Sequence, residues 1–127
     1  MDGLTERGEL VRVDDATFEI EVIRSPLPVV VDFYADWCAP CRVIEPTLRE
    51  LAVRLSGRVK FAQVNVDEAE VVTRSFGIHA IPTYLFVESG MEKGREVGPL
   101  DPVAFRTILR RYFAKGAASS GGTPANR

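Results

Sequence analysis

The residues best suited to chemistry in this chain are its only two cysteines, which stand two residues apart in Trp37-Cys38-Ala39-Pro40-Cys41. Two thiols at this spacing can close into a disulfide and open again, and that exchange carries two electrons. The run over 29–35 reads as a strand and the run that follows the motif reads as a helix. The pair therefore lies where a strand ends and a helix begins, and both thiols belong to one reactive site.

Structural cysteines and a metal site are the competing explanations for this pair. The chain has 127 residues and is 46% hydrophobic, which suits one globular domain that can build its own core without a disulfide or a metal. The only histidine, His79, is expected on a surface loop. Two cysteines and one histidine are too few for the usual four ligands of a structural zinc, so we expect no metal site.

Charge and hydropathy exclude several classes of function. The formal net charge is -2 and the two signs are mixed along the chain, so we expect no nucleic-acid partner. No apolar run approaches the roughly 20 residues that span a membrane. The first residues lack the basic start and apolar run of a secretory signal, so we expect a cytoplasmic protein, acting as a monomer. Reducing cytosol disfavours a permanent disulfide, which favours a catalytic pair.

The pattern of apolar residues predicts an α/β fold, with a central mixed β-sheet flanked by helices on both faces. Crossover helices imply parallel strands in the middle, and a turn over 88–91 implies antiparallel strands at one side. We expect a flexible leader over 1–8, one domain over 9–115 and a disordered tail over 116–127. The expected strands are 9–13, 29–34, 59–66, 83–87 and 92–97; the expected helices are 14 or 15 to 24, 38–56 (kinked at Pro46), 70–76 and from Pro102 onward, capped by Asp101.

With these motifs in this order, the chain resembles the thioredoxin family over about residues 11–113. A lone pair of cysteines at this spacing is weak evidence, whereas an ordered set of separated motifs is strong. The set comprises Asp32-Phe33-Tyr34-Ala35, Trp37-Cys38-Ala39-Pro40-Cys41, Pro46, Asn65-Val66-Asp67, Phe76-Gly77-Ile78, Ile81-Pro82-Thr83 and Val97-Gly98. The resemblance implies the thioredoxin fold and a protein disulfide oxidoreductase.

The resemblance and the residues together suggest roles for three catalytic side chains. Cys38, at the amino end of a helix, is expected to be the nucleophile, because free amides and the helix dipole favour a thiolate. Cys41 is expected to be the resolving thiol, one turn further on and more buried. Asp32 stands in an apolar strand, where burial would raise its pKa toward neutrality. The resemblance makes it the proton acceptor for Cys41, and the alternative is a strand-end aspartate facing water.

Further positions are expected to frame the site and contact substrate. The resemblance implies that the bond before Pro82 is cis and packs against the cysteines. Two departures from the common family pattern stand out: Ala39 replaces a glycine, and Gln63 replaces a lysine beside Asp32. The expected substrate-binding residues are Trp37, Ala39, Pro40, Ile81, Pro82 and Gly98.

Three functions are compatible with this sequence. The leading interpretation is a protein disulfide reductase that uses no cofactor beyond the Cys38–Cys41 disulfide. Its partners would be oxidised target proteins and a separate thioredoxin reductase, because the chain has no dinucleotide-binding fingerprint of its own. The alternatives are an oxidase or isomerase of the same fold, and a binding module that uses no catalysis.

Overall fold

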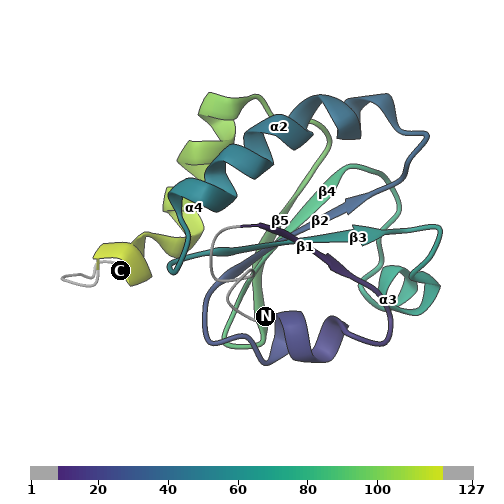
Figure 1. Ribbon diagram of the computed structural model, residues 1–127, viewed down its shortest axis with the longest axis horizontal. Helices are drawn as coiled ribbons and strands as arrows, with labels where there is room; N and C mark the ends of the chain where they lie inside the picture. Colours follow the sequence, from purple (N-terminus) through teal and green to yellow (C-terminus); the bar gives the residue numbers. More distant parts are fainter. Residues whose placement is uncertain (1–8, 119–127) are drawn as a thin grey trace.

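A five-stranded sheet organises this molecule, in the spatial order β1-β3-β2-β4-β5 (Figure 1). The computed structural model describes residues 9–118, and the side chains of residues 9–113. Its elements are β1 (Leu10–Val13), η1 (Glu19–Ile23), β2 (Val29–Tyr34), α2 (Ala39–Arg54), β3 (Lys60–Asn65), α3 (Glu70–Ser75), β4 (Thr83–Glu88), β5 (Met91–Val97) and α4 (Pro102–Ala118).

The sheet is mixed, as the sequence predicts. Strands β1, β3 and β2 run parallel, because helical crossovers connect them, and β4 and β5 add antiparallel pairs. The connection between β4 and β5 is a tight turn in which Ser89 and Gly90 both have positive φ, 53° and 78°. Such turns match the twist of the strands they join, and glycine adopts this conformation at little cost.

Helices cover both faces of the sheet (Figure 1), which confirms the predicted α/β layering. Helices α2 and α4 pack on one face, over a buried cluster that includes Val30, Leu48 and Phe86. Helix α3 and η1 pack on the other face, over a cluster that includes Val31 and Phe33. Alternate residues of β2 thus supply two separate cores, because successive side chains of a strand point to opposite faces.

The helix predicted before β2 is shorter than expected and differs in type. Five residues, Glu19–Ile23, form a π-helix, in which the Arg24 amide donates to the Glu19 carbonyl at 2.9 Å. Asp14 does cap the preceding turn, accepting bonds from the amides of Ala16 and Thr17 at 3.0 and 3.1 Å.

Asp15 has a different role from the one predicted for it. Its carboxylate accepts bonds from the amides of Val71 and Val72, at 3.2 and 2.8 Å. These amides belong to the first turn of α3, whose own N-cap residue, Ala69, has no side chain able to accept them. A carboxylate from a distant segment therefore caps this helix.

The two long helices begin and end close to the predicted positions. Helix α2 continues through Pro46 to Arg54, and Gly57 follows it with a φ of 83°. Helix α4 begins as predicted, with the Ala104 amide donating to Asp101 Oδ1 at 2.8 Å. It continues to Ala118, so residues 116–118 of the expected tail are helical. The expected leader over 1–8 and residues 119–127 lie outside the described residues.

Candidate active site at the start of helix α2

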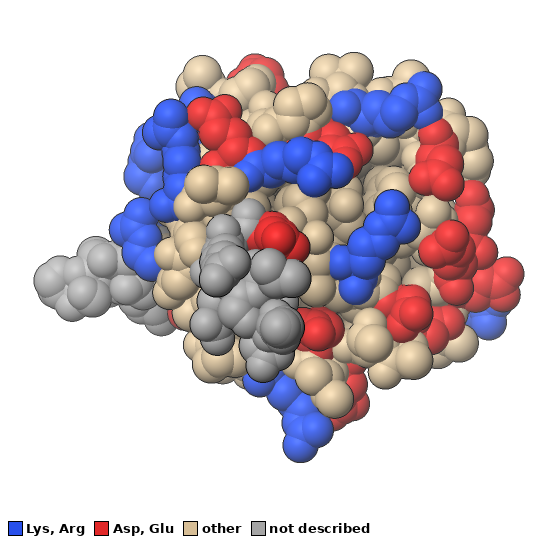
Figure 2. All heavy atoms as spheres, viewed as in Figure 1, with Lys and Arg blue, Asp and Glu red and all other residues tan. Residues whose placement is uncertain are grey.

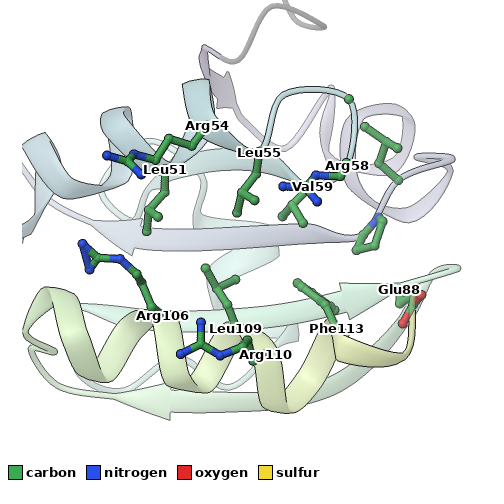
Figure 3. Close-up of a pocket in the computed structure, with 13 residues that line it drawn as sticks. Leu51, Arg54, Leu55, Arg58, Val59, Glu88, Arg106, Leu109, Arg110 and Phe113 are labelled. Atoms are coloured by element: carbon green, nitrogen blue, oxygen red, sulfur yellow. The ribbon is translucent and has the colours of Figure 1, made fainter. Parts of the chain in front are cut away.

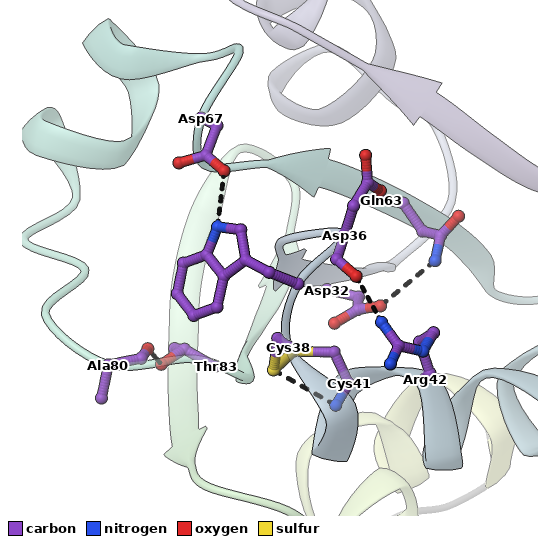
Figure 4. Close-up of a disulfide and its surroundings, with 10 residues drawn as sticks. Asp32, Asp36, Cys38, Cys41, Arg42, Gln63, Asp67, Ala80 and Thr83 are labelled. Carbon is purple, nitrogen blue, oxygen red and sulfur yellow. Dashed lines mark hydrogen bonds between the residues drawn. A yellow bond between two sulfur atoms is a disulfide. The ribbon is translucent and has the colours of Figure 1, made fainter.

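The two cysteines form a disulfide at the amino end of α2, with their Cα atoms 5.3 Å apart. Cys38 is the N-cap residue, and the Cys41 amide donates to Cys38 Sγ at 3.3 Å (Figure 4). A sulfur in this position lies at the positive end of the helix dipole, which favours its thiolate form after reduction. Cys38 and Cys41 are 5% and 4% exposed in this oxidised state, so Cys41 is only marginally the more buried of the two.

Short backbone contacts hold the turn that presents these cysteines. Strand β2 ends at Tyr34, and the Cys38 amide then donates to the Ala35 carbonyl at 3.1 Å. The guanidinium of Arg42 donates to the carbonyl of Asp36, which ties the loop to the first turn of α2. Pro40 fits in that first turn, where no helical amide bond is lost.

Asp32 is buried beneath this end of α2, with only 2% of its surface exposed. Its Oδ2 accepts a bond from Gln63 Nε2 at 3.3 Å (Figure 4), while Oδ1 has no hydrogen-bond partner. Burial raises the pKa of Asp32 from 3.8 to about 7; the Gln63 bond lowers it and the charge of Glu45 raises it. The prediction that the carboxyl of Asp32 is buried is therefore confirmed, and the water-facing alternative is wrong.

A row of polar residues crosses the whole sheet at the level of Asp32. In register across the strands lie Arg12 on β1, Gln63 on β3, Asp32 on β2, Tyr84 on β4 and Glu96 on β5. Residues in register on neighbouring strands point to the same face, here the face covered by α2 and α4. We call these five residues the polar row. The hydroxyl of Tyr84 is buried without a hydrogen-bond partner, and burial, followed by the charge of Asp32, raises its pKa.

A small polar cavity of about 240 Å³ joins Cys41 to this row. Both Cys41 and Gln63 line it, together with two residues of opposite charge, Glu45 and Arg12. The cavity is large enough to hold water, and its walls offer several hydrogen-bond partners. Gln63 links it to Asp32, which does not itself line the cavity.

The segment before β4 lies against the disulfide. The bond between Ile81 and Pro82 is cis, as the resemblance implies, and Ile81 packs against the cluster that contains both cysteines. Gly98 reaches the same place from the end of β5, since its amide donates to the Pro82 carbonyl at 2.8 Å. Thr83 Oγ1 donates to the Ala80 carbonyl at 2.6 Å and holds the turn (Figure 4). Of the predicted contact residues, Ile81 therefore packs beside the cysteines, and the Gly98 bond ties the end of β5 to the adjacent Pro82.

Trp37, Ala39 and Pro40, which flank Cys38 in the chain, are exposed. Trp37 is 68% exposed, which excludes a core role, and its Nε1 donates to Asp67 Oδ2 at 2.8 Å (Figure 4). Asp67 has no role predicted from the sequence, although it belongs to one of the motifs that carry the resemblance. Glu45 likewise has no predicted role, although it follows Cys41 by one helical turn and could have been found from that spacing.

Figure 2 shows acidic and basic side chains interspersed over one face of the molecule, with neither sign dominating it. Within residues 9–118, no three His, Cys, Asp or Glu side chains are grouped so that they could hold a metal. Among the described helices, none is both long and apolar enough to cross a membrane.

A mixed sheet that presents a closed Cys-x-x-Cys pair at a helix start, beside a cis-proline, defines a disulfide oxidoreductase of the thioredoxin fold.

Comparison with known proteins agrees with this class. The Thioredoxin family model matches residues 9–111. Thioredoxin of Haemophilus influenzae is 36% identical over 105 residues, 83% of this chain and 98% of that protein. Thioredoxin of Rickettsia bellii is 42% identical over 86 residues, 68% and 82% of the two chains. Thioredoxin M5, chloroplastic, of Oryza sativa is 36% identical over 106 residues, 84% and 62%.

This chain therefore belongs to the thioredoxin family, and its activity is the reduction of protein disulfides by dithiol–disulfide exchange. Thioredoxins carry out this exchange with their redox-active disulfide and no further cofactor. Family membership also implies the general class of partners, which are a thioredoxin reductase and proteins that carry disulfides.

Proposed function

We propose that Cys38 makes the first attack on the target disulfide and that Cys41 completes the reaction. The observation that carries this assignment is the Cys41 amide directed at Cys38 Sγ, at the positive end of α2. The same amide and dipole would stabilise a Cys38 thiolate. Cys41 has no such position, because its sulfur lies within the first turn rather than at its cap.

The proposed reaction has two exchanges. The Cys38 thiolate attacks one sulfur of the target disulfide, forming a mixed disulfide and releasing the other target sulfur as a thiolate. Cys41 then loses its proton and attacks Cys38 Sγ. The mixed disulfide breaks, the second target sulfur leaves as a thiolate, and the Cys38–Cys41 disulfide observed here is formed. Two electrons thus pass from the dithiol to the target, and holding Cys41 in place makes the second step intramolecular.

We propose that Asp32 accepts the proton that Cys41 loses in the second exchange. A carboxyl with a pKa of about 7 is partly ionised at neutral pH, so it can both accept and release a proton. The cavity shared by Cys41 and Gln63 supports this role, because Gln63 also bonds Asp32. Glu45 and Arg12 line the same cavity, and water held between them would carry the proton to solvent.

The proposed contact surface for a target chain flanks the disulfide on two sides. The exposed side chains of Trp37, Ala39 and Pro40 form one side, and Ile81, Pro82 and Gly98 form the other. Because proline has no amide hydrogen, Pro82 leaves space for the backbone of the target. Asp67 would act as a positioning residue, since its bond to Trp37 fixes the indole ring.

We propose that the protein acts as a monomer in the cytoplasm and is reduced by a separate thioredoxin reductase. The chemistry supports a reducing compartment, because a reductant must return the disulfide to its dithiol after each cycle. One relative named above is a chloroplast protein, so cell fractionation with an antibody to this chain is the test of location. Sedimentation at several concentrations is the test of the monomer.

The order of attack is tested by trapping the mixed disulfide. Reduced Cys41→Ser, mixed with a small test protein that has an accessible disulfide, should accumulate a covalent adduct. On a non-reducing gel the adduct would migrate at the summed mass, and excess dithiothreitol would remove it.

Cys38→Ser is the matched control for this experiment. It keeps one thiol of the pair but removes the proposed nucleophile, so it should give no adduct under the same conditions. Adducts with Cys38→Ser and none with Cys41→Ser would reverse the assignment.

A further inference from the structure

A second, larger cavity lies between α2 and α4, at the end of α2 opposite to the disulfide (Figure 3). Its volume of about 770 Å³ is in the range of small-molecule sites. Cys41 and Leu51, the nearest residues of the two places on α2, are ten positions apart, which corresponds to roughly 15 Å of helix. The cavity therefore shares no wall with the redox site, and the disulfide chemistry described above does not use it.

The walls of this cavity combine an apolar floor with a set of cations. Leu51, Leu55, Leu109 and Phe113 supply much of the floor, two from α2 and its end and two from α4. Four arginines lie around it, Arg54 and Arg58 on one side and Arg106 and Arg110 on the other (Figure 3). We call this cavity the arginine groove.

The charges of the groove are only partly neutralised within the described residues. Arg54 forms an exposed ion pair with Glu50 at 3.1 Å, and Arg106 donates to the Pro102 carbonyl at 3.3 Å. In residues 9–118, no acidic side chain pairs with the guanidinium of Arg58 or of Arg110. Two arginines from opposite walls thus remain available to one anion.

One acidic residue also lines the groove. Glu88, at the end of β4, has a buried Oε1 with no hydrogen-bond partner. Four guanidinium groups outweigh this carboxylate and the partial negative charge at the end of α2. The groove is therefore complementary to a negative ligand. A hydrogen-bond donor on the ligand could also bond the unpartnered Oε1 of Glu88 at that end of the groove.

We propose that the arginine groove binds an amphipathic anion, a small molecule with an apolar body and one carboxylate or phosphate group. The body would lie on the leucines and Phe113, and the anionic group would bond Arg58 and Arg110. Arginine suits this task because its planar group can offer two parallel hydrogen bonds to a carboxylate or a phosphate.

The two ends of the chain are the alternative occupants of the groove, and they differ in how well they fit it. Residues 119–127, Ser-Ser-Gly-Gly-Thr-Pro-Ala-Asn-Arg, contain no acidic side chain and no large apolar one. Residues 1–8 include Leu4 and two acidic side chains, Asp2 and Glu6, so this segment is a competitor that the experiment must exclude.

The proposal is tested by calorimetric titration of the full chain with four probes. Decanoate and decyl phosphate have both required features and separate a carboxylate source from a phosphate source. Decylammonium has the same tail with the opposite charge, and acetate has the charge without the tail. We expect binding of decanoate, decyl phosphate or both, and binding at least about tenfold weaker for decylammonium and acetate, since a charge-assisted bond contributes a factor of this size.

Matched variants place the binding in the groove. Arg58→Gln and Arg110→Gln should each weaken the binding of the preferred probe by about tenfold. Arg49→Gln is the control, because Arg49 is another exposed arginine of α2, paired with Glu45 and not part of the groove. Arg49→Gln should bind as the original chain does.

The binding should be independent of the redox mechanism. Cys38→Ser/Cys41→Ser should bind the probe normally, and Arg58→Gln should still reduce the test protein, so this proposal can fail while the redox mechanism holds.

Four results would overturn the proposal. The first is that no probe binds, and the second is that decylammonium binds as well as decanoate. The third is that binding requires deletion of residues 1–8, because the groove would then be occupied by the chain itself. Equal loss in Arg49→Gln and Arg58→Gln would likewise show a nonspecific effect of surface charge.

Discussion

Two rows of residues on the same face of the sheet differ sharply in chemistry. The polar row lies under the start of α2 and contains the buried Asp32. Two residues earlier along β2 lies a row in register that we call the apolar row: Leu10, Phe61, Val30, Phe86 and Gly94. The same helices cover both rows, and the strands are continuous between them. The difference therefore lies in side chains alone.

The polar row is less favourable for stability than the apolar row. In the apolar row, Phe86 packs against three aromatic rings of α4, those of Phe105, Tyr112 and Phe113. In the polar row, one oxygen of Asp32 and the hydroxyl of Tyr84 are buried without partners. Such groups cost free energy that a well-packed apolar row does not lose. The costly row is the one beneath the reactive sulfurs.

The largest expected effect comes from breaking the apolar row. Phe86→Ala should lower the free energy of unfolding by about 3–5 kcal/mol, because a fully buried ring is lost and its neighbours fill the space only in part. Urea denaturation followed by circular dichroism measures this loss. Under conditions where the variant stays folded, the pH dependence of its reduction rate should match that of the original chain. A changed pH profile would mean that the two rows are not independent.

Removing the charge of the polar row should have the opposite effect on stability. The pKa of Asp32 is higher in the folded than in the unfolded state, so the folded state resists ionisation of this carboxyl. The resulting loss in the free energy of unfolding grows as pH rises from about 4 to about 7. Asp32→Asn should therefore stabilise the protein at pH 8, by up to about 4 kcal/mol, and change its stability little at pH 4. Denaturation at both pH values tests this. Equal effects at the two would contradict a carboxyl titrating in this range.

The same variant should slow the second exchange. With no proton acceptor beside Cys41, the mixed disulfide should resolve about 100-fold more slowly at pH 7. Rapid-quench measurement of the mixed disulfide gives this rate, and attack by Cys38 on the target serves as the internal control. Slowing of the first exchange alone would remove Asp32 from the proposed role.

A cation placed in the polar row should test the role of Asp32 as proton acceptor. Gln63→Lys brings a positive charge near Asp32 and should lower the pKa of that carboxyl, moving the acidic limb of the pH–rate profile down by about one pH unit. Gln63→Glu is the control of opposite sign and should move the limb upward. A profile that stays in place in both variants would show that Gln63 does not influence the proton transfer.

The smallest expected effect is the removal of one hydroxyl. Tyr84→Phe deletes a buried group without a partner and keeps the ring, whose centroid lies 5.1 Å from that of Phe105. We expect a gain of about 1 kcal/mol in the free energy of unfolding. A loss of stability, measured by the same denaturation, would mean that the hydroxyl has a partner in solution.

Much of the fold and the centre of the site could be predicted from the sequence, because the signals involved are local. The Cys pair at a strand–helix junction, the cap by Asp101 and the mixed sheet all follow from residues close together in the chain. The cap that Asp15 provides for α3 could not be predicted, since 56 residues separate its carboxylate from the Val71 amide. The polar row was missed for a similar reason. Arg12 and Glu96 join Asp32 only through the register of five strands, which no local pattern specifies.

The central claim of this account is that the buried carboxyl of Asp32 exchanges a proton near neutral pH. Titration of the Asp32 side-chain carbonyl carbon by nuclear magnetic resonance, in the oxidised protein, measures this directly. The account predicts a midpoint at about pH 7. A midpoint near 3.8 would contradict it, because Asp32 would then be fully ionised at neutral pH and would be a poor acceptor for the proton of Cys41.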